Sequence, residues 1–353
     1  MGIVSSKHII DFCDSYLLSS WEGIEDSSVD LVVTSPPSPM VKVWDDSFIR
    51  VDDGIKECID GGDKWGAFNT MHAILFVVWK RLFKVVKDGG IVCISVGDAT
   101  RRIGKDFTFF PNASSVSLWM VEAGFTPLPP ILWRTNLKEQ GRFMGSGMLP
   151  VNAHVVHETE PILVFRKGSS RVFSDSESIL RKESALFFRE RNSYYRGAWE
   201  IQAIKQKMLE GDLWSGGMVF PIEIPFRLVR MFSIYGDTVF DPFSGQGNTS
   251  VASAVLGRNS AGFELDRGLL KTGSRKIRGL YLRQPHYMKD TFMKYIKSSE
   301  GEFSSVTQGY NVWHPHEDRQ EFYYLKGVEM EIGVDKVSWD VSYEKEEDVL
   351  SEI

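Results

Sequence analysis

Short apolar runs alternate with longer amphipathic segments over most of this chain. The runs occupy residues 7–14, 29–35, 91–97, 237–240 and 260–266. Those at 29–35 and 91–97 have the length and composition of strands that are covered on both faces of a parallel sheet. Apolar residues recur at helical spacing in the segments between them, at residues 71–90, 114–125, 221–234 and 248–257. This alternation predicts an α/β fold with a doubly wound, Rossmann-like sheet.

The ends of these segments carry further signals. Thr70 is the expected cap of the first helix, and Gly89 and Gly90 are its expected end, while the Asp- and Gly-rich residues 39–66 predict a loop. Two extended, proline-containing segments at residues 125–135 and 158–167 are joined by a glycine-rich loop. Proline is tolerated at sheet edges, so they predict an antiparallel edge hairpin on a mostly parallel sheet.

Two regions interrupt this pattern. Residues 169–211 show no sheet pattern, and between Arg166 and Lys207 the chain has 10 basic and 5 acidic residues interleaved with aromatic ones. The carboxyl-terminal residues 286–353 are acidic but still contain apolar and aromatic positions, which predicts a folded extension. We therefore expect one discontinuous domain, residues 1–168 and 212–285, with an insertion at 169–211.

The distribution of charge matters more than the net charge of −6. Residues 299–353 hold 14 acidic and 4 basic residues, so the rest of the chain is mildly basic and compatible with a polyanionic partner. The three cysteines show no metal-ligand spacing, which predicts no metal site and reduced thiols in a cytoplasmic protein. No apolar run has the length of a membrane span, so we expect no membrane partner.

Two motifs follow predicted strands. The strand at residues 30–33 runs into Thr34-Ser35-Pro36-Pro37, where two prolines stop the strand and stiffen the corner. In "DPFSGQGNT", residues 241–249, Gly245 and Gly247 let the backbone approach a ligand closely. Ser250 replaces the third glycine of a dinucleotide fingerprint, which disfavours NAD, whereas Glu264 is spaced to bind ribose hydroxyls.

Taken together, "TSPP" and "DPFSGQGNT" resemble the motifs of S-adenosylmethionine-dependent DNA amino-methyltransferases, in the order typical of their β group. Similar segments are "IIDFCDSYLL", "KDGGIVCISVGDA", "VVHETEPILVFRKG", "FPIEIPFRLVRMFSIYGDTVFDPF" and "LGRNSAGFELD". The resemblance covers roughly residues 7–168 and 212–280. It implies a catalytic domain at 1–168 and 212–285, a target-recognition region at 169–211, and an acidic extension at 286–353.

The resemblance also assigns roles to individual residues. Ser35 Oγ and the Pro36 carbonyl would accept hydrogen bonds from the target amine, with Pro37 completing the rigid corner. The residues implied to contact S-adenosyl-L-methionine are Asp14, Thr34, Pro221, Asp241, Phe243, Ser244, Gly245, Gly247, Phe263 and Glu264, with Leu265 near the adenine. A helix or turn cap is an equally good interpretation of Asp14.

A serine at the head of this motif is typical of cytosine-N4 enzymes, and Asp or Asn of adenine-N6 enzymes. Cytosine N4 is therefore the expected target, with adenine N6 as the alternative; no cysteine sits in the Pro-Cys setting of C5 enzymes. The family usually has an aromatic residue after the two prolines to stack on the extruded base, but this chain has Ser38. Trp44 could take that role or simply pack, and a catalytically inactive DNA-binding relative stays an alternative.

Double-stranded DNA is the expected partner, and the basic, aromatic insertion is the expected reader of its sequence. The candidate DNA-binding residues are Arg181, Lys182, Arg189, Arg191 and Arg196; a basic surface around a small local core is the competing interpretation. The glycine-containing loop at residues 137–152 is a second candidate contact. A methyltransferase acting on RNA or a small molecule is a third option. A cognate restriction endonuclease acting on the same site, and a monomer or homodimer, complete these expectations.

Overall fold

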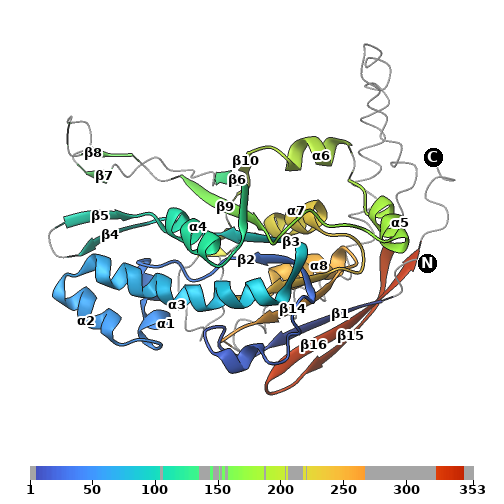
Figure 1. Cartoon of the computed structure of the whole chain (residues 1–353), viewed down its shortest axis with the longest axis horizontal. Helices are drawn as coiled ribbons and strands as arrows, with labels where there is room; N and C mark the ends of the chain where they lie inside the picture. Colours follow the sequence, from blue (N-terminus) through green and yellow to red (C-terminus); the bar gives the residue numbers. More distant parts are fainter. Residues whose placement is uncertain are drawn as a thin grey trace, which may run out of the picture.

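The fold is built on one ten-stranded sheet with the strand order β10-β6-β9-β3-β2-β13-β14-β1-β16-β15 (Figure 1). The computed structural model describes residues 5–103, 106–134, 144–145, 151, 153–155, 158–186, 188–202, 204–205, 218–219, 221–266 and 323–345. The five central strands are mutually parallel: β3 (Val86–Ser95), β2 (Val29–Thr34), β13 (Thr238–Asp241), β14 (Asn259–Phe263) and β1 (Ser5–Asp11). The predicted α/β class and mostly parallel core are confirmed.

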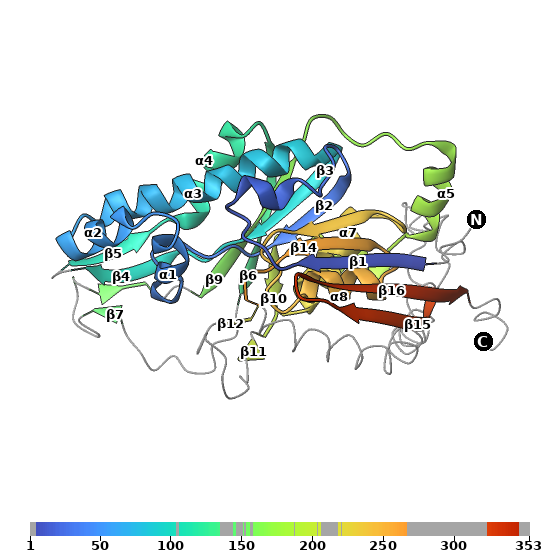
Figure 2. The ribbon, with the colours of Figure 1, turned by 90° about the horizontal axis from the view of Figure 1, so that it is seen from below.

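Helices cover both faces of the sheet, as Figure 2 shows. Val32 of β2 packs in one core with α3 (Lys64–Val85) and α4 (Asn112–Glu122). Its neighbours Leu31 and Val33 point the other way, into a second core with α7 (Glu223–Phe232), and α8 (Asn248–Val255) lies beside α7. Every residue of β2 is buried, which explains why its middle, residues 31–33, is continuously apolar rather than alternating.

The region before α3 differs from the predicted loop. It contains a short 3-10 turn, η2 (Lys42–Trp44), and two helices, α1 (Asp45–Ile49) and α2 (Gly54–Gly61). Helix α3 begins at Lys64 rather than near Thr70, because the Asp63 side chain caps it by accepting the N–H of Gly66. The predicted end was also wrong: α3 stops at Val85, and Gly89, with a φ of 81°, lies within β3.

The proline-containing hairpin is confirmed, but it is not the edge of the sheet. Strands β6 (Thr126–Arg134) and β9 (Thr159–Arg166) are antiparallel, and β9 also pairs with β3. The short strand β10 (Ala198–Glu200) pairs in parallel with β6. The insertion therefore supplies a strand to the main sheet, although its sequence shows no sheet pattern. It also contains α5 (Asp175–Glu183) and α6 (Phe188–Tyr194).

The acidic extension also joins the sheet. Strands β15 (Tyr323–Ile332) and β16 (Lys336–Lys345) form a hairpin, and β16 pairs antiparallel with β1. Trp339 is buried and stacks on His8 with ring centroids 5.3 Å apart. This part of the extension is folded as expected, but it belongs to the central sheet rather than to a separate appendage.

Three small two-stranded ribbons lie outside the main sheet. They are β4 (Ala99–Ile103) with β5 (Asp106–Phe110), β7 (Met144–Gly145) with β8 (Ala153–His154), and β11 (Ile204–Lys205) with β12 (Met218–Val219). Among the described helices, none is long and apolar enough to cross a membrane.

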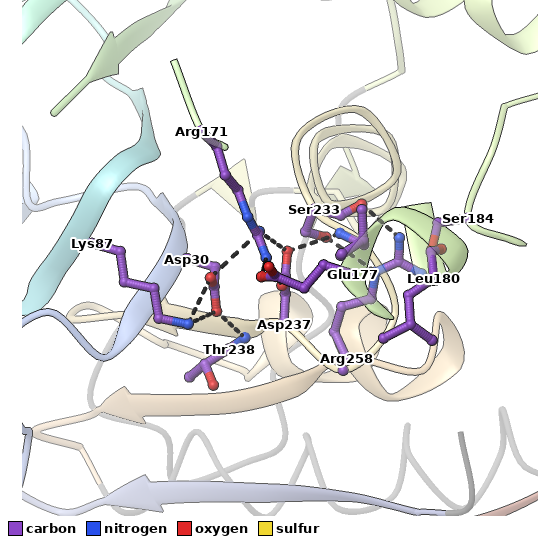
Figure 3. Close-up of polar contacts among 12 residues, drawn as sticks. Asp30, Lys87, Arg171, Glu177, Leu180, Ser184, Ser233, Asp237, Thr238 and Arg258 are labelled. Atoms are coloured by element: carbon purple, nitrogen blue, oxygen red, sulfur yellow. Dashed lines mark hydrogen bonds and ion pairs between the residues drawn. The ribbon is translucent and has the colours of Figure 1, made fainter. Parts of the chain in front are cut away.

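An ion network around two buried carboxylates, Asp30 and Asp237, fastens the start of the insertion to the sheet (Figure 3). The Arg171 guanidinium donates to both carboxylate oxygens of Asp237 at 2.7 and 3.0 Å and to Glu177 of α5 at 2.8 Å. It also lies 3.4 Å from Asp30, whose carboxylate binds Lys87 and accepts the N–H of Thr238. Asp30 and Asp237 lie at the amino ends of β2 and β13, so α5 is held at that edge of the sheet.

Replacing Arg171 by alanine is expected to lower the free energy of unfolding by about 3–5 kcal/mol. The buried Asp237 carboxylate loses its only ion-pair partner among the described residues, and Asp30 loses one of two. Urea denaturation would measure this. Arg181→Ala is a matched control, since Arg181 is exposed on α5 and lies over the Phe173 ring. A loss below about 1 kcal/mol would show that this network does not hold the insertion in place.

Candidate functional site

The Ser-Pro-Pro corner stands at the carboxyl end of β2, beside the end of β3, where Thr34 pairs with Ile94. Ser35 is half-buried and Pro36 is buried. Within the described part of the chain, neither Ser35 Oγ nor the Pro36 carbonyl oxygen accepts a hydrogen bond. The corner therefore presents two hydrogen-bond acceptors, held by a backbone that prolines restrict.

The chain after this corner is tightly restrained. Met40 has a φ of 64°, a left-handed conformation that is unfavourable for a residue with a side chain. Its side chain is buried, and its N–H points at Met71 Sδ of α3 at 3.3 Å. Such backbone strain persists only where surrounding contacts determine it, and it is concentrated at functional sites.

A buried amide connects this turn to the end of β3. Asn112, the first residue of α4, is fully buried, and its Nδ2 donates to the carbonyl oxygens of Pro39 and Gly97 at 2.9 Å each. Its Oδ1 lies 3.1 Å from His72 Nε2 on α3. Since Oδ1 only accepts, the proton of His72 is on Nε2, and burial lowers the pKa of His72 to about 4, so the ring stays neutral. Asn112 thereby positions the Ser-Pro-Pro turn, and the sequence analysis missed it.

The glycine motif begins at the end of β13, the strand next to β2, and a buried carboxylate joins the two motifs. Asp241 Oδ1 accepts the Thr34 hydroxyl at 2.7 Å and the Phe243 N–H at 3.0 Å. Burial raises the pKa of Asp241 to about 6, although these hydrogen bonds oppose the shift. Two motifs that lie about 200 residues apart in sequence are thus in direct contact.

The glycine turn leaves room for a ligand. Gly245 and Gly247 have φ values of 53° and 74°, in the left-handed region that favours glycine. Apart from the adjoining residues of the chain, no heavy atom lies within 4 Å of the position a Gly245 Cβ would take. Ser244 shapes the turn, since its Oγ donates to the Asp241 carbonyl at 2.9 Å and its N–H to the Phe263 carbonyl at 2.8 Å.

Glu264, directly after β14, faces this turn. Its carboxylate accepts the N–H of Gly245 at 2.6 Å and that of Asp266 at 2.7 Å. Burial raises the pKa of Glu264 to about 7, with a smaller contribution from the charges of Asp266 and Asp241. A carboxylate beside open space at a glycine turn suits a ligand that carries hydroxyl groups, so these residues fit the nucleoside expected from the sequence.

Tyr16 adds an unsatisfied group to this cluster. Its ring lies 5.8 Å from that of Phe243, and its buried hydroxyl has no hydrogen-bond partner among the described residues. Asp14, two residues earlier, accepts the Tyr16 N–H at 3.0 Å and pairs with Arg50 at 2.6 Å. Asp14 is therefore a turn cap in this structure, as the alternative interpretation predicted, and its contact with a cofactor stays a prediction.

The remaining residues predicted to contact the cofactor or the base differ in their burial. Pro221 is buried just before α7. The Phe263 ring is buried in the core, edge-on to Trp21 and Phe240, whereas Leu265 is 50% exposed. Trp44 is half-buried in η2 and packs against the core that includes α3, in agreement with its packing interpretation.

The predicted DNA-binding residues divide into two groups. Arg181 and Lys182 lie on α5, at the amino edge of the sheet and therefore opposite Ser35 (Figures 1 and 2). Arg191 and Arg196 are exposed on and just after α6, while the Arg189 side chain lies outside the described residues. Most of the predicted contact loop at 137–152 also lies outside them. In the described part of the chain, no cluster of His, Cys, Asp and Glu could hold a metal ion.

The proteins that this chain resembles in sequence are DNA methyltransferases. Residues 29–275 match a family model described as DNA methylase of the N6/N4 type. The Type II methyltransferase M.MthZI of Methanothermobacter thermautotrophicus is 39% identical over 91% of this chain and 91% of its own length. M.MjaI of Methanocaldococcus jannaschii is 40% identical over 78% of this chain and 92% of its own. A Thermus thermophilus structure in complex with S-adenosyl-L-methionine superposes with a TM-score of 0.56 at 27% identity, covering 76% and 91% of the two chains.

Proposed function

This chain belongs to the N6/N4 family of S-adenosylmethionine-dependent DNA methyltransferases, and on that premise we propose that it methylates the exocyclic N4 amine of cytosine in duplex DNA. The observation that supports this most directly is the pair of free acceptors, Ser35 Oγ and the Pro36 carbonyl, at the carboxyl end of β2 in the described structure. The Thr34–Asp241 hydrogen bond holds them next to the glycine turn.

The chemistry follows from these acceptors. The lone pair of an exocyclic amine is delocalised into the ring, which makes the amine a weak nucleophile. Acceptors at Ser35 and Pro36 would bind its two N–H groups and favour the geometry in which the lone pair is free, as fixed dipoles do for a developing charge. S-adenosylmethionine supplies an electrophilic methyl group on a positively charged sulfur. Rigid alignment by the proline corner would then provide much of the acceleration.

The glycine turn and its neighbours would hold the cofactor. Glu264 would accept hydrogen bonds from ribose hydroxyls, Gly245 and Gly247 would allow close approach, and the buried Tyr16 hydroxyl would gain a partner. Leu265 is exposed enough to lie against the adenine, whereas the Phe263 ring is committed to the core. The target base must leave the helix stack to reach the Ser-Pro-Pro corner, so base flipping is part of the proposal.

The choice of cytosine over adenine rests on the serine that heads the motif. Adenine N6 is the alternative within the family, because the serine rule has exceptions. Ser38, which stands where an aromatic residue usually stacks on the base, keeps the inactive DNA-binding relative as a further alternative. Relatives named Type II methyltransferases favour a role in restriction–modification, with a cognate endonuclease. Arg191 and Arg196 stay in the proposed DNA contact, whereas Arg181 and Lys182 do not, because α5 lies at the opposite edge.

Nucleoside analysis tests this proposal. The protein would be expressed in a host that lacks DNA methylation, and its genomic DNA would be digested and examined by mass spectrometry. N4-methylcytosine is the expected product. N6-methyladenine would overturn the choice of base while retaining the family chemistry, and the absence of any methylated base would favour the inactive, DNA-binding alternative.

Asn112→Ala is expected to lower the single-turnover rate by up to about 10²-fold, because the Ser-Pro-Pro turn loses the amide that ties it to Gly97. The KM for S-adenosylmethionine should change little, since Asn112 does not contact the glycine turn. Ser117→Ala on the same helix is the control, because its hydroxyl bonds only to the Ala113 carbonyl among described groups. Equal losses in rate and in cofactor affinity would indicate general unfolding instead of mispositioning.

A further inference from the structure

The hairpin formed by β4 and β5 emerges beside the Ser-Pro-Pro corner. Strand β3 ends at Ser95, next to the end of β2, and β4 begins at Ala99. Asn112 bonds to Gly97 at the base of the hairpin and to Pro39 after the corner. In Figures 1 and 2 the hairpin projects with α1 and α2 at the end of the molecule away from α5. A duplex whose base reaches Ser35 would therefore pass the base of this hairpin.

One face of this hairpin contacts helices α1 and α3. Arg101 forms a two-pronged ion pair with Asp45 of α1, at 2.7 Å for each contact. Lys64 of α3 donates to the Thr108 hydroxyl at 2.9 Å, and Phe110 is fully buried. These contacts hold a two-stranded ribbon in a defined orientation.

The opposite face has a different composition. Because side chains alternate along a strand, the cross-strand pairs Thr100–Phe109 and Arg102–Phe107 share the face that points away from α1 and α3. Phe109 is 47% exposed, and Arg102 is exposed and has no ion pair with any side chain that the structure describes, a set that does not include Asp106. A cation and an exposed aromatic ring thus lie diagonally across the two strands, on the same face of the ribbon.

The charges around the hairpin favour the approach of DNA to the face that carries Arg102 and Phe109, which we call the outer face. Arg101 is neutralised by Asp45, and Asp60 is paired with Lys56, but the exposed acidic residues Asp52, Asp53 and Glu57 follow α1 along the chain, on or next to α2. A polyanion would be repelled by that side, whereas Arg102 attracts it from the other. Proteins that bind nucleic acids combine cationic side chains for phosphates with aromatic rings for bases.

We propose that this outer face, Thr100, Arg102, Phe107 and Phe109, is a DNA-contacting arm of the enzyme, an inference that rests on the proposed function. Arg102 neutralises a phosphate close to the flipped nucleotide, and Phe109 packs against the bases left beside it. The arm would position the duplex at the Ser-Pro-Pro corner. It therefore contributes at the carboxyl edge of the sheet, where α5 cannot reach.

The test uses the full chain and a fluorescent duplex cut from unmethylated phage DNA that the wild-type protein methylates. Arg102→Ala is expected to reduce by about 1 the slope of log affinity against log salt concentration, since one phosphate contact is lost. Phe109→Ala is expected to weaken binding about tenfold, the effect of losing one stacking contact. Binding of S-adenosylmethionine, measured separately by calorimetry, should not change in either variant.

Two comparison variants make the result specific. Arg102→Lys keeps the charge and should restore the salt slope, and Arg181→Ala, at the opposite edge of the sheet, should leave the slope unchanged. A wild-type slope and affinity in both Arg102→Ala and Phe109→Ala would overturn the arm while the proposed function stands. A wild-type protein that methylates no DNA would instead overturn the proposed function itself.

Discussion

Replacing Ser35 by alanine is expected to lower kcat by about 10²–10³-fold, the usual effect of losing one fixed hydrogen-bonding group aimed at a transition state. The substitution removes an acceptor that no described residue uses, so it should leave the packing of β2 intact. Rapid-quench measurement of methyl transfer to a DNA substrate would give the rate. Calorimetric titration with S-adenosylmethionine should give a wild-type affinity, because Ser35 is proposed to bind the amine and not the cofactor.

Ser38→Ala is the matched control for this prediction. Ser38 lies in the same turn and is also half-buried, and its carbonyl, which the substitution retains, accepts the Val41 N–H. Its rate should stay within about threefold of wild type, the scale of a lost neutral hydrogen bond. If Ser35→Ala retained wild-type kcat, or if both variants lost activity equally, Ser35 would not be the acceptor of the target amine.

Replacing Glu264 by glutamine is expected to weaken S-adenosylmethionine binding by about 10–100-fold, because charge-assisted hydrogen bonds contribute about 1.5–3 kcal/mol. The same residue predicts a pH dependence. Burial raises the pKa of Glu264 to about 7, so below pH 7 the free protein holds the carboxyl group mostly protonated. Ribose hydroxyls donate best to the ionised form, and cofactor affinity should therefore rise as the pH increases from about 6 to 8.

The Glu264→Gln variant distinguishes the ionisation of Glu264 from that of the nearby Asp241 and Asp266. Glu264→Gln cannot ionise, so its affinity should be nearly flat above pH 7, where the pKa of Asp241, raised to about 6, no longer contributes. Asp266→Asn keeps Glu264 and its hydrogen bond from the residue 266 N–H, and it should keep a pH dependence shifted to lower pH. A wild-type affinity that is constant from pH 6 to 8 would exclude the ionised Glu264 as a ribose acceptor.

Local rules explain which predictions succeeded. The prolines after Thr34 and the glycines at 245 and 247 restrict or free the backbone over a few residues, so their turns could be read without the fold. The buried strands were equally clear, since β2 is covered on both faces. The start of α3 was misplaced because one aspartate, Asp63, caps it ahead of the stronger apolar pattern.

Contacts between residues that are distant in the chain could not be predicted from local sequence patterns. Asn112 is an ordinary residue at a helix start in the sequence, and only the packing of α3 and α4 places its amide between Pro39 and Gly97. Phe263 is predicted near the adenine from its place in the motif, but only the tertiary packing shows its ring edge-on to Trp21 and Phe240 in the core. Arg181 and Arg191 look alike in a basic stretch, yet α5 is fastened at the amino edge of the sheet by the Arg171 network.

The sequence alone thus determined the α/β class, the two motifs at strand ends and the resemblance to amino-methyltransferases, since each depends on residues that are neighbours in the chain. The tertiary structure decided which groups meet: the Thr34–Asp241 hydrogen bond, the place of α5, the outer face of the β4–β5 hairpin and the pairing of β16 with β1. These contacts join distant segments. Their energies come from burial and charge pairing that exist only once the strand order has formed.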